Sequence, residues 1–248
     1  LDITDTDEVL NFGVINRPDV IINCAAVTDT DFCEKEPELA YRVNALGARN
    51  LSIVARKTGA KMVQISTDDV FDGIRHTPYT EFDDTNPKTV YGRSKRAGEN
   101  YVKEFTHKHF ILRSNWVYGN GNNFVNRVLH AADTKDELLI ASDQFGSPTS
   151  AKDLARIILY LIKTNEYGTY HATNEGICSW ADFAEGIFEL AGKKVTVNHI
   201  PTSEYPTRAV RPLNSRMSKD KLEQMGFSRL PHWKDALERY LKELEILK

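Results

Sequence analysis

The sequence predicts an α/β fold with a doubly wound parallel sheet. Two observations lead to this expectation: short apolar runs alternate with longer amphipathic stretches, and polar residues directly follow several of the apolar runs. Strands that alternate with helices form parallel sheets, which bind ligands beyond the carboxyl ends of their strands. The chain has 248 residues, enough for one large α/β domain or for one such domain with a smaller lobe.

The first elements are predicted from their flanking residues. Residues 19–25 form an apolar run after Pro18, which indicates a buried strand, and residues 61–67 form the next such run. Between them, residues 37–58 have helical periodicity, with a proline in the first turn and Gly59 as the stop. Further strands are predicted at 109–118, 137–142, 168–173 and 195–200, and further helices at 94–106, 122–133, 151–164, 179–191 and 232–247. We expect the segments 68–88 and 201–216 to be irregular.

Composition excludes several classes of protein. A formal net charge of −3 provides no basic surface for nucleic acid, and no apolar run approaches the roughly 18 residues that span a bilayer. The three cysteines, Cys24, Cys33 and Cys178, contain no CxxC pair, which favours reduced thiols in a cytoplasmic protein. The histidines are scattered and lack neighbouring ligands, so we expect no metal site.

Polar residues that suit proton transfer follow the predicted strands. Thr67 ends one strand, Tyr91 and Lys95 stand four residues apart at the start of the next helix, and Trp116 lies near the end of the following strand. The spacing places Tyr91 and Lys95 on one helical face, where an ammonium lowers the pKa of a phenol. Such a phenol can exchange a proton while a carbonyl and an alcohol interconvert, with Thr67 bonded to the same oxygen. Hydride transfer itself needs a nicotinamide, so the expected cofactor is NADPH or NADH.

By itself the YxxxK spacing is weak evidence, because a surface tyrosine and lysine often match it by chance. A longer ordered series of motifs is more specific. Ser66-Thr67-Asp68-x-Val70-Phe71-Asp72-Gly73 and Val90-Tyr91-Gly92-x-x-Lys95-x-x-Gly98-Glu99 resemble the extended short-chain dehydrogenases, and more narrowly the dTDP-4-dehydrorhamnose reductase family. Further matches to that family are residues 19–26, Asn44-Ala45, Arg113-x-x-Trp116-Val117-Tyr118, residues 121–124, residues 143–149 and residues 211–216.

The resemblance implies roles for individual residues. Tyr91 is implied as the general acid that protonates the 4-keto oxygen of a dTDP-sugar, with Lys95 tuning Tyr91 and holding the nicotinamide ribose. Thr67 is implied as the hydroxyl member of this catalytic triad. The implied sugar contacts are Thr67, Asp68 and Trp116, and the implied cofactor contacts are Asp2 and Ile3 beside the adenine, Ala26, Val27 and Thr28 in the loop after a strand, Tyr91 and Lys95. Residues 211–216 would face the nucleotide end of the substrate.

The family further implies a Rossmann-like cofactor domain at 1–142 and a mainly substrate-binding lobe at 143–248, with segments that return to the main sheet. The implied reaction is the NAD(P)H-dependent reduction of dTDP-4-dehydro-6-deoxy-L-mannose to dTDP-L-rhamnose, and a homodimer is compatible with it. Two alternatives stay open. One is a different extended short-chain epimerase or reductase acting on another sugar nucleotide, and the other is a non-catalytic relative resembling the regulatory β subunit of methionine adenosyltransferase.

Two departures from the family pattern affect these expectations. Asp69 replaces a tyrosine of the family's Ser-Thr-Asp-Tyr motif, which bears on packing or substrate affinity. The family's first strand, glycine-rich turn, helix and second strand do not precede Leu1 in this sequence, and Gly119 to Phe124 imitates a glycine-rich turn only after the YxxxK motif.

We therefore expect the 248 residues alone to bind NAD(P)H weakly and to be inactive or nearly so. The pyrophosphate of such a cofactor rests on backbone N–H groups at a glycine turn and helix start. Without them we expect a Kd of around millimolar where an intact site reaches micromolar, a deficit of roughly 4 kcal/mol. Fluorescence titration with NADPH, on this chain and on one extended by a family-like amino terminus, measures the difference. Micromolar binding by the shorter chain would contradict the expectation.

Overall fold

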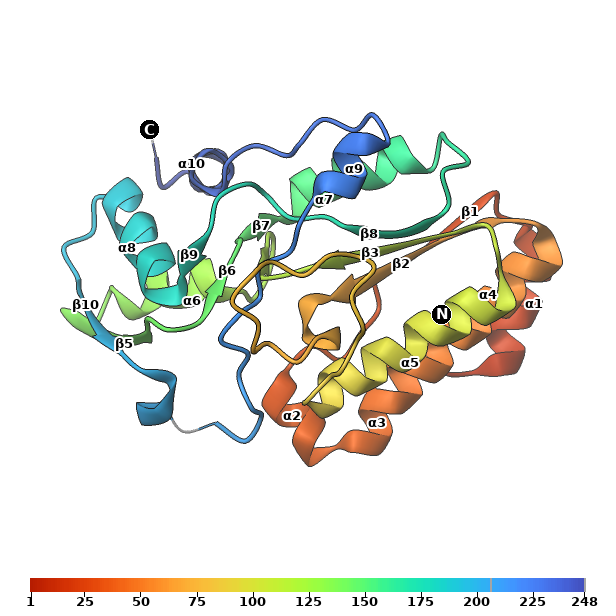
Figure 1. The fold of residues 1–248 in the computed structure, drawn as a ribbon, viewed down its shortest axis with the longest axis horizontal. Coiled ribbons are helices and arrows are strands. Elements are labelled where there is room, and N and C mark those ends of the chain that lie inside the picture. The colour runs from red at the N-terminus through yellow and green to blue at the C-terminus, as the bar shows by residue number, and fades with distance from the viewer. Residues whose placement is uncertain (206, 248) are drawn as a thin grey trace.

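A four-stranded parallel sheet lies at the centre of the computed structural model, which describes residues 1–205 and 207–247. Its strands are β1 (Val20–Asn23), β2 (Lys61–Thr67), β3 (His109–Ser114) and β8 (Gly168–His171), in the order β1-β2-β3-β8 (Figure 1). The register pairs Asn23 with Gln64, Thr67 with Ser114, and Arg113 with His171. All four strands therefore end at the same edge of the sheet, and the predicted α/β fold with a parallel sheet is confirmed.

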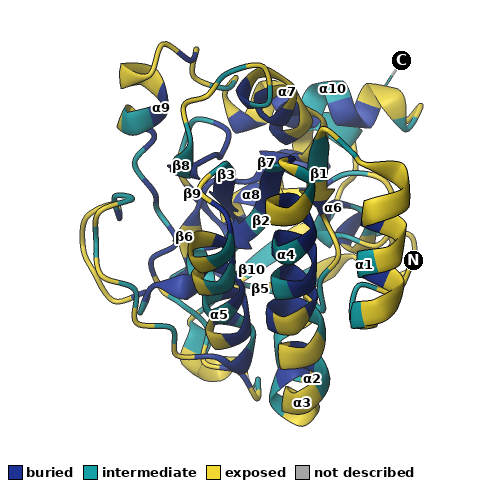
Figure 2. Ribbon diagram, turned by 90° about the vertical axis from the view of Figure 1, so that its right-hand side faces the viewer, coloured by how far each residue is buried: buried dark blue, intermediate teal, exposed yellow. Residues whose placement is uncertain are grey.

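Helices cover both faces of this sheet. On one face lie α1 (Thr6–Asn16), α4 (Ala48–Thr58) and α5 (Val90–Phe105), and on the other α7 (Ala151–Leu161) and α9 (Asp220–Gln224) (Figure 1). The first face packs a core of Val9, Leu51, Val54, Met62, Val102 and Ile111, and the second a core of Val63, Phe110, Leu112, Leu154, Ile158, Leu161 and Tyr170. Buried and exposed residues alternate along α4 and α5, whereas α1 is mostly exposed (Figure 2). The apolar stripes of α4 and α5 thus face the sheet.

A third core lies beside the sheet. It is built by α6 (Phe124–Ala131), α8 (Trp180–Ala191) and α10 (Trp233–Glu243), with the parallel pair β5 (Glu137–Ala141) and β10 (Thr196–Ile200) packed against them (Figure 1). Two short pairs connect this region to the sheet: β4 (Val117–Tyr118) with β7 (Thr149–Ser150), and β6 (Phe145–Gly146) with β9 (Cys178–Ser179). The division into 1–142 and 143–248 stays a prediction.

Several predicted elements differ from those observed. The single helix expected over 37–58 is divided into α3 (Pro37–Tyr41), a π-helical turn (Arg42–Gly47) and α4. The strand expected over 109–118 ends at Ser114, because the backbone turns at Trp116 with a φ of 47°. Five elements were not predicted from the sequence: α1, α2 (Thr30–Lys35), α9, and the 3₁₀ segments Asp68–Val70 and Thr202–Glu204. No helix in the described part of the chain is long and apolar enough to span a membrane.

Candidate active site

The start of helix α5 is held by three side chains from outside the helix body. Thr89 Oγ1 accepts a hydrogen bond from the Gly92 amide at 2.9 Å, and Glu34 Oε1 accepts one from the Val90 amide at 2.7 Å. The Thr89 hydroxyl in turn donates to Asp69 Oδ2 at 3.3 Å. A Cβ atom at Gly92 would lie only 2.1 Å from the Asp69 carbonyl oxygen. The first turn of α5 is therefore fixed against the loop that follows β2.

This packing brings the predicted triad together. Thr67 ends β2 close to the Tyr91 side chain, and Lys95 donates to the Ile65 carbonyl oxygen at 2.6 Å. Thr67 and Lys95 are buried, and Tyr91 is half-buried. Residues predicted from a strand end and from the next helix thus meet at the carboxyl edge of the sheet, where a doubly wound fold binds its ligands.

The pKa of Tyr91 is shifted in the direction opposite to the predicted one. Burial raises the pKa of Tyr91, the Asp69 carboxylate raises it further, and the hydrogen bond with Thr67 opposes the change. The prediction that Lys95 lowers the pKa of Tyr91 is wrong for this structure, because burial and the two neighbouring carboxylates outweigh any such effect. Burial also lowers the pKa of Lys95, to about 8. A phenol with a raised pKa stays protonated at neutral pH, so Tyr91 holds a proton that it can donate.

A buried ion pair joins strand β3 to helix α5, which carries Tyr91 and Lys95. Arg113 on β3 donates from Nε and Nη2 to the two carboxylate oxygens of Glu99 on α5, both at 2.8 Å, and the Ser66 hydroxyl donates to Glu99 at 2.6 Å. Burial alone raises the pKa of Glu99, but the hydrogen bond and charge of Arg113 outweigh it and hold the pKa below its usual range. Glu99 and Arg113 belong to the family motifs, but no role was predicted for either.

Two adjacent carboxyl groups face the same region. Burial raises the pKa of Asp68 and of Asp69, the latter to about 6, and the charge of Asp69 further raises the pKa of Asp68. Ser215, in the irregular segment after β10, lies beside Asp68 and lowers the pKa of that carboxyl. Asp68 thus lies beside Thr67 as expected, and Asp69 is part of the immediate surroundings of Tyr91.

These raised pKa values predict a pH-dependent stability. The folded state binds more protons than the unfolded state between the ordinary pKa near 4 and the raised pKa near 6, so stability falls as pH rises through this window. Asp69→Asn should remove part of this loss. Between pH 4 and pH 7, the free energy of unfolding of the variant should rise by about 1–3 kcal/mol relative to that of the wild type. Urea unfolding at both pH values measures it, with the exposed Asp84→Asn as control. Equal pH dependence in wild type and Asp69→Asn would contradict this account.

Trp116 occupies a strained position two residues beyond the end of β3. Its φ of 47° is uncommon for a residue other than glycine, and such strain is concentrated at functional sites. Its ring stacks on Trp180 with centroids 3.7 Å apart, and Gly146 provides the space beside it. Because Ser114 pairs with Thr67 in the sheet, Trp116 lies near the triad. Trp180 was not predicted as a site residue, because its only signal in the sequence was its place at the start of a predicted helix.

The predicted cofactor residues are joined by the π-helical turn. Asn44 accepts from the Val27 amide at 2.8 Å and donates to the Val27 carbonyl oxygen at 3.0 Å, which fixes the loop after β1. Ile3 packs against Gly47, where a Cβ atom would lie 2.4 Å from the Ile3 side chain. Asn44 also donates to Ser94 on α5 at 3.0 Å. The turn was predicted as plain helix, although π-helical turns are frequent at functional sites.

These residues suit a nicotinamide dinucleotide. Ala26 to Thr28 follow β1 at the carboxyl edge of the sheet, and the buried Lys95 ammonium, which would hold a ribose hydroxyl, lies beside β2 and donates to the Ile65 carbonyl oxygen. Asp2 is an exposed carboxylate whose Oδ1 already accepts from the backbone and hydroxyl of Thr4. The residues thus supply both acceptors and a cationic donor, as hydroxyl-rich ligands require.

The turn at Gly119 to Phe124, which imitates a glycine-rich turn, has a structural role. Asn123 caps α6 and donates to the Gly119 and Gly121 carbonyl oxygens, so a side chain of the turn itself closes it.

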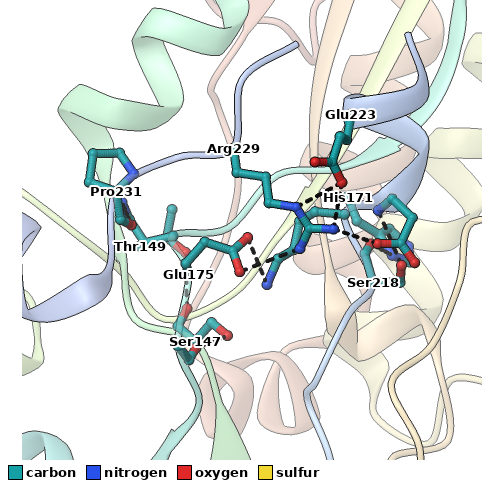
Figure 3. Close-up of polar contacts among 12 residues, drawn as sticks. Ser147, Thr149, His171, Glu175, Ser218, Glu223, Arg229 and Pro231 are labelled. Carbon is teal, nitrogen blue, oxygen red and sulfur yellow. Dashed lines mark hydrogen bonds and ion pairs between the residues drawn. The ribbon is translucent and has the colours of Figure 1, made fainter. Parts of the chain in front are cut away.

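His171 also has a structural role. It lies at the end of β8 and donates to the Ser218 carbonyl oxygen at 3.1 Å, and burial lowers its pKa to about 3 (Figure 3). A histidine this weakly basic stays neutral and is no general base at neutral pH.

Arg229, in the segment after α9, connects this segment to α9 and to the loop after β8. It forms ion pairs with Asp220 and Glu223, both at 2.7 Å, and with Glu175 at 3.6 Å (Figure 3). In the described ranges, no group of three or more His, Cys, Asp or Glu residues is placed to hold a metal ion.

A parallel α/β sheet with Thr67, Tyr91 and Lys95 at its carboxyl edge defines the class of extended short-chain dehydrogenases. Within this class, the profile of the family described as the RmlD substrate binding domain matches residues 1–246. The chain belongs to this family, that of the dTDP-4-dehydrorhamnose reductases, and the resemblance seen in the sequence is confirmed.

Individual relatives agree with this assignment. The spore coat polysaccharide biosynthesis protein SpsK of Bacillus subtilis is 44% identical over 228 residues, which cover 92% of this chain and 80% of that protein. A dTDP-4-dehydrorhamnose reductase of Clostridium acetobutylicum superposes with a TM-score of 0.97 at 46% identity, covering 99% of this chain and 88% of that one. The Bacillus anthracis reductase, solved in complex with NADP, gives a TM-score of 0.96 at 45% identity, with 98% and 87% covered.

Proposed function

We propose that the protein catalyses the NAD(P)H-dependent reduction of dTDP-4-dehydro-6-deoxy-L-mannose (dTDP-4-dehydro-L-rhamnose) to dTDP-L-rhamnose in the cytoplasm. The observation that carries the proposal is the position of the Tyr91 phenol in the first turn of α5, which packs against the loop that follows Thr67 at the end of β2. A phenol and a hydroxyl placed together can both bond one carbonyl oxygen. The relative solved with NADP supports the choice of cofactor.

In the proposed reaction Thr67 and Tyr91 bind the 4-keto oxygen of the sugar. When bound, the nicotinamide supplies a hydride for the carbonyl carbon. Tyr91 donates its proton to the oxygen as negative charge develops there, and its raised pKa favours return of a proton to the phenolate afterwards. Lys95 holds the ribose of the cofactor, while Asp68 and Trp116 contact the sugar. The remainder of the dinucleotide site is lined by Asp2, Ile3, Ala26, Val27 and Thr28.

The experiment is product analysis with the full-length protein, NADPH or NADH, and dTDP-4-dehydro-L-rhamnose. We expect one cofactor oxidised for each dTDP-L-rhamnose formed. An epimerase would interconvert sugars while recycling its cofactor, and a non-catalytic binding relative would oxidise none. Either result would reject the proposal. Because SpsK is named for a spore coat polysaccharide, a panel of other 4-keto sugar nucleotides belongs in the same assay.

A further inference from the structure

Helix α2 carries two acidic residues that reach distant parts of the chain. Asp31 and Glu34 are three residues apart and therefore neighbours on the helix surface. Cys33, on the same helix, is fully buried and packs with Ala40 and Val90, which anchors the helix beside the start of α5. Neither acidic residue belongs to the cofactor or sugar contacts named above.

Asp31 binds residues 207–217, which we call the strap. Its Oδ1 accepts a hydrogen bond from the Ala209 amide at 2.8 Å, and its Oδ2 forms an ion pair with Arg211, which also donates to the Thr30 hydroxyl. Arg211 was expected to face the nucleotide end of the substrate, and in the structure its guanidinium is engaged by α2. The first part of the strap is thereby tied to the cofactor side of the molecule.

The strap continues from this anchor to the sugar side of the active site. The Ser215 amide donates to the Phe145 carbonyl oxygen at 2.7 Å, and the Ser215 carbonyl oxygen accepts from Asn115 at 2.5 Å. The Ser215 side chain lies beside Asp68, the predicted sugar contact, and Asn115 directly precedes Trp116. A displacement of the strap would therefore change the positions of both Asp68 and Trp116.

Glu34 connects α2 to helix α5. Its bond to the Val90 amide satisfies one of the free N–H groups in the first turn of α5, one residue before Tyr91. Asp31 and Glu34 thus join the strap and the proton donor through a single rigid turn of helix.

We propose that α2 is a positioning element for the reaction: Asp31 holds the strap against the sugar-nucleotide site, and Glu34 holds Tyr91 at the reacting oxygen. The inference rests on the proposed function. Asp31 affects substrate affinity, because the strap contacts the sugar side, whereas Glu34 and Thr89 bond the first turn of α5 directly. Glu34 affects the chemical step, because a small displacement of a catalytic group costs rate rather than binding.

The test compares variants of the full-length protein in steady-state kinetics. Asp31→Ala should raise KM for the dTDP-sugar about tenfold or more while kcat and KM for NADPH stay within about threefold. Glu34→Ala should lower kcat about fivefold or more with KM nearly unchanged. Glu34→Gln should restore kcat, since its amide oxygen still accepts from Val90. Glu38→Gln, on the exposed side of neighbouring α3, is the matched control and should change nothing.

A second readout does not depend on turnover. Trypsin cleavage after the exposed Arg208 should be accelerated in Asp31→Ala and unchanged in Glu38→Gln, and the dTDP affinity measured by calorimetry should fall only in Asp31→Ala. If the wild type fails to reduce the dTDP-sugar, the proposed function is wrong, and these two measurements still decide the role of Asp31. Unchanged cleavage and affinity would overturn that role. An equal loss in all variants, with lowered thermal stability, would show a merely structural helix and overturn the inference.

Discussion

Replacing Tyr91 with phenylalanine should lower kcat by about 10²- to 10⁴-fold, the usual contribution of general acid catalysis. Phenylalanine keeps the ring that packs at the start of α5 but removes the hydroxyl beside Thr67. Binding of NADPH and of the dTDP-sugar should therefore stay within a few-fold. Stopped-flow measurement of NADPH oxidation in single turnovers gives the chemical step directly.

The matched control is Tyr101→Phe, farther along the same helix, where the ring packs near Phe105. It should retain the parental kcat. A Tyr91→Phe variant with more than half of the parental kcat would show that another group donates the proton.

Substitution of Glu99 by glutamine should destabilise the protein by about 3–5 kcal/mol, because it leaves the Arg113 guanidinium buried without its charged partner. Both side chains are at most 2% exposed, and Ser66 shares the same carboxylate. Urea unfolding at neutral pH measures the loss. The pKa of Glu99 is held low in the fold, so its contribution is present above the ordinary carboxyl pKa and fades as pH falls below it.

Lys103→Gln provides the comparison, because it removes a second cation from the same carboxylate. Lys103 lies 3.9 Å from Glu99 and is 38% exposed, so its loss should cost less than about 1 kcal/mol. Equal costs for Glu99→Gln and Lys103→Gln would mean that burial does not govern this ion pair.

Parts of the site were predictable because they depend on strand ends and helical spacing. The apolar run 61–67 followed by polar residues determined that Thr67 ends a strand, and spacing placed Tyr91 and Lys95 on one face of α5. Parallel strands end at one edge, so these residues had to meet there. The ordered motifs also determined the family, since they extend over most of the chain.

Other features depend on contacts between residues far apart in the sequence, which local patterns do not encode. The strand break at Trp116 follows from pairing of Val117 with Thr149 and stacking on Trp180. The bond between Asp31 and Ala209 joins residues 178 positions apart.

The pKa of Tyr91 is the clearest such case. The sequence by itself determined the fold class and the family, and it predicted the triad, but its spacing argument predicted a lowered pKa. The tertiary structure decided the opposite direction, because burial and the neighbouring carboxylates of Asp69 and Asp68 outweigh any effect of Lys95, which donates to the Ile65 carbonyl oxygen. Desolvation and the distances between charges are properties of the packed molecule, and they set the protonation state on which the proposed reaction depends.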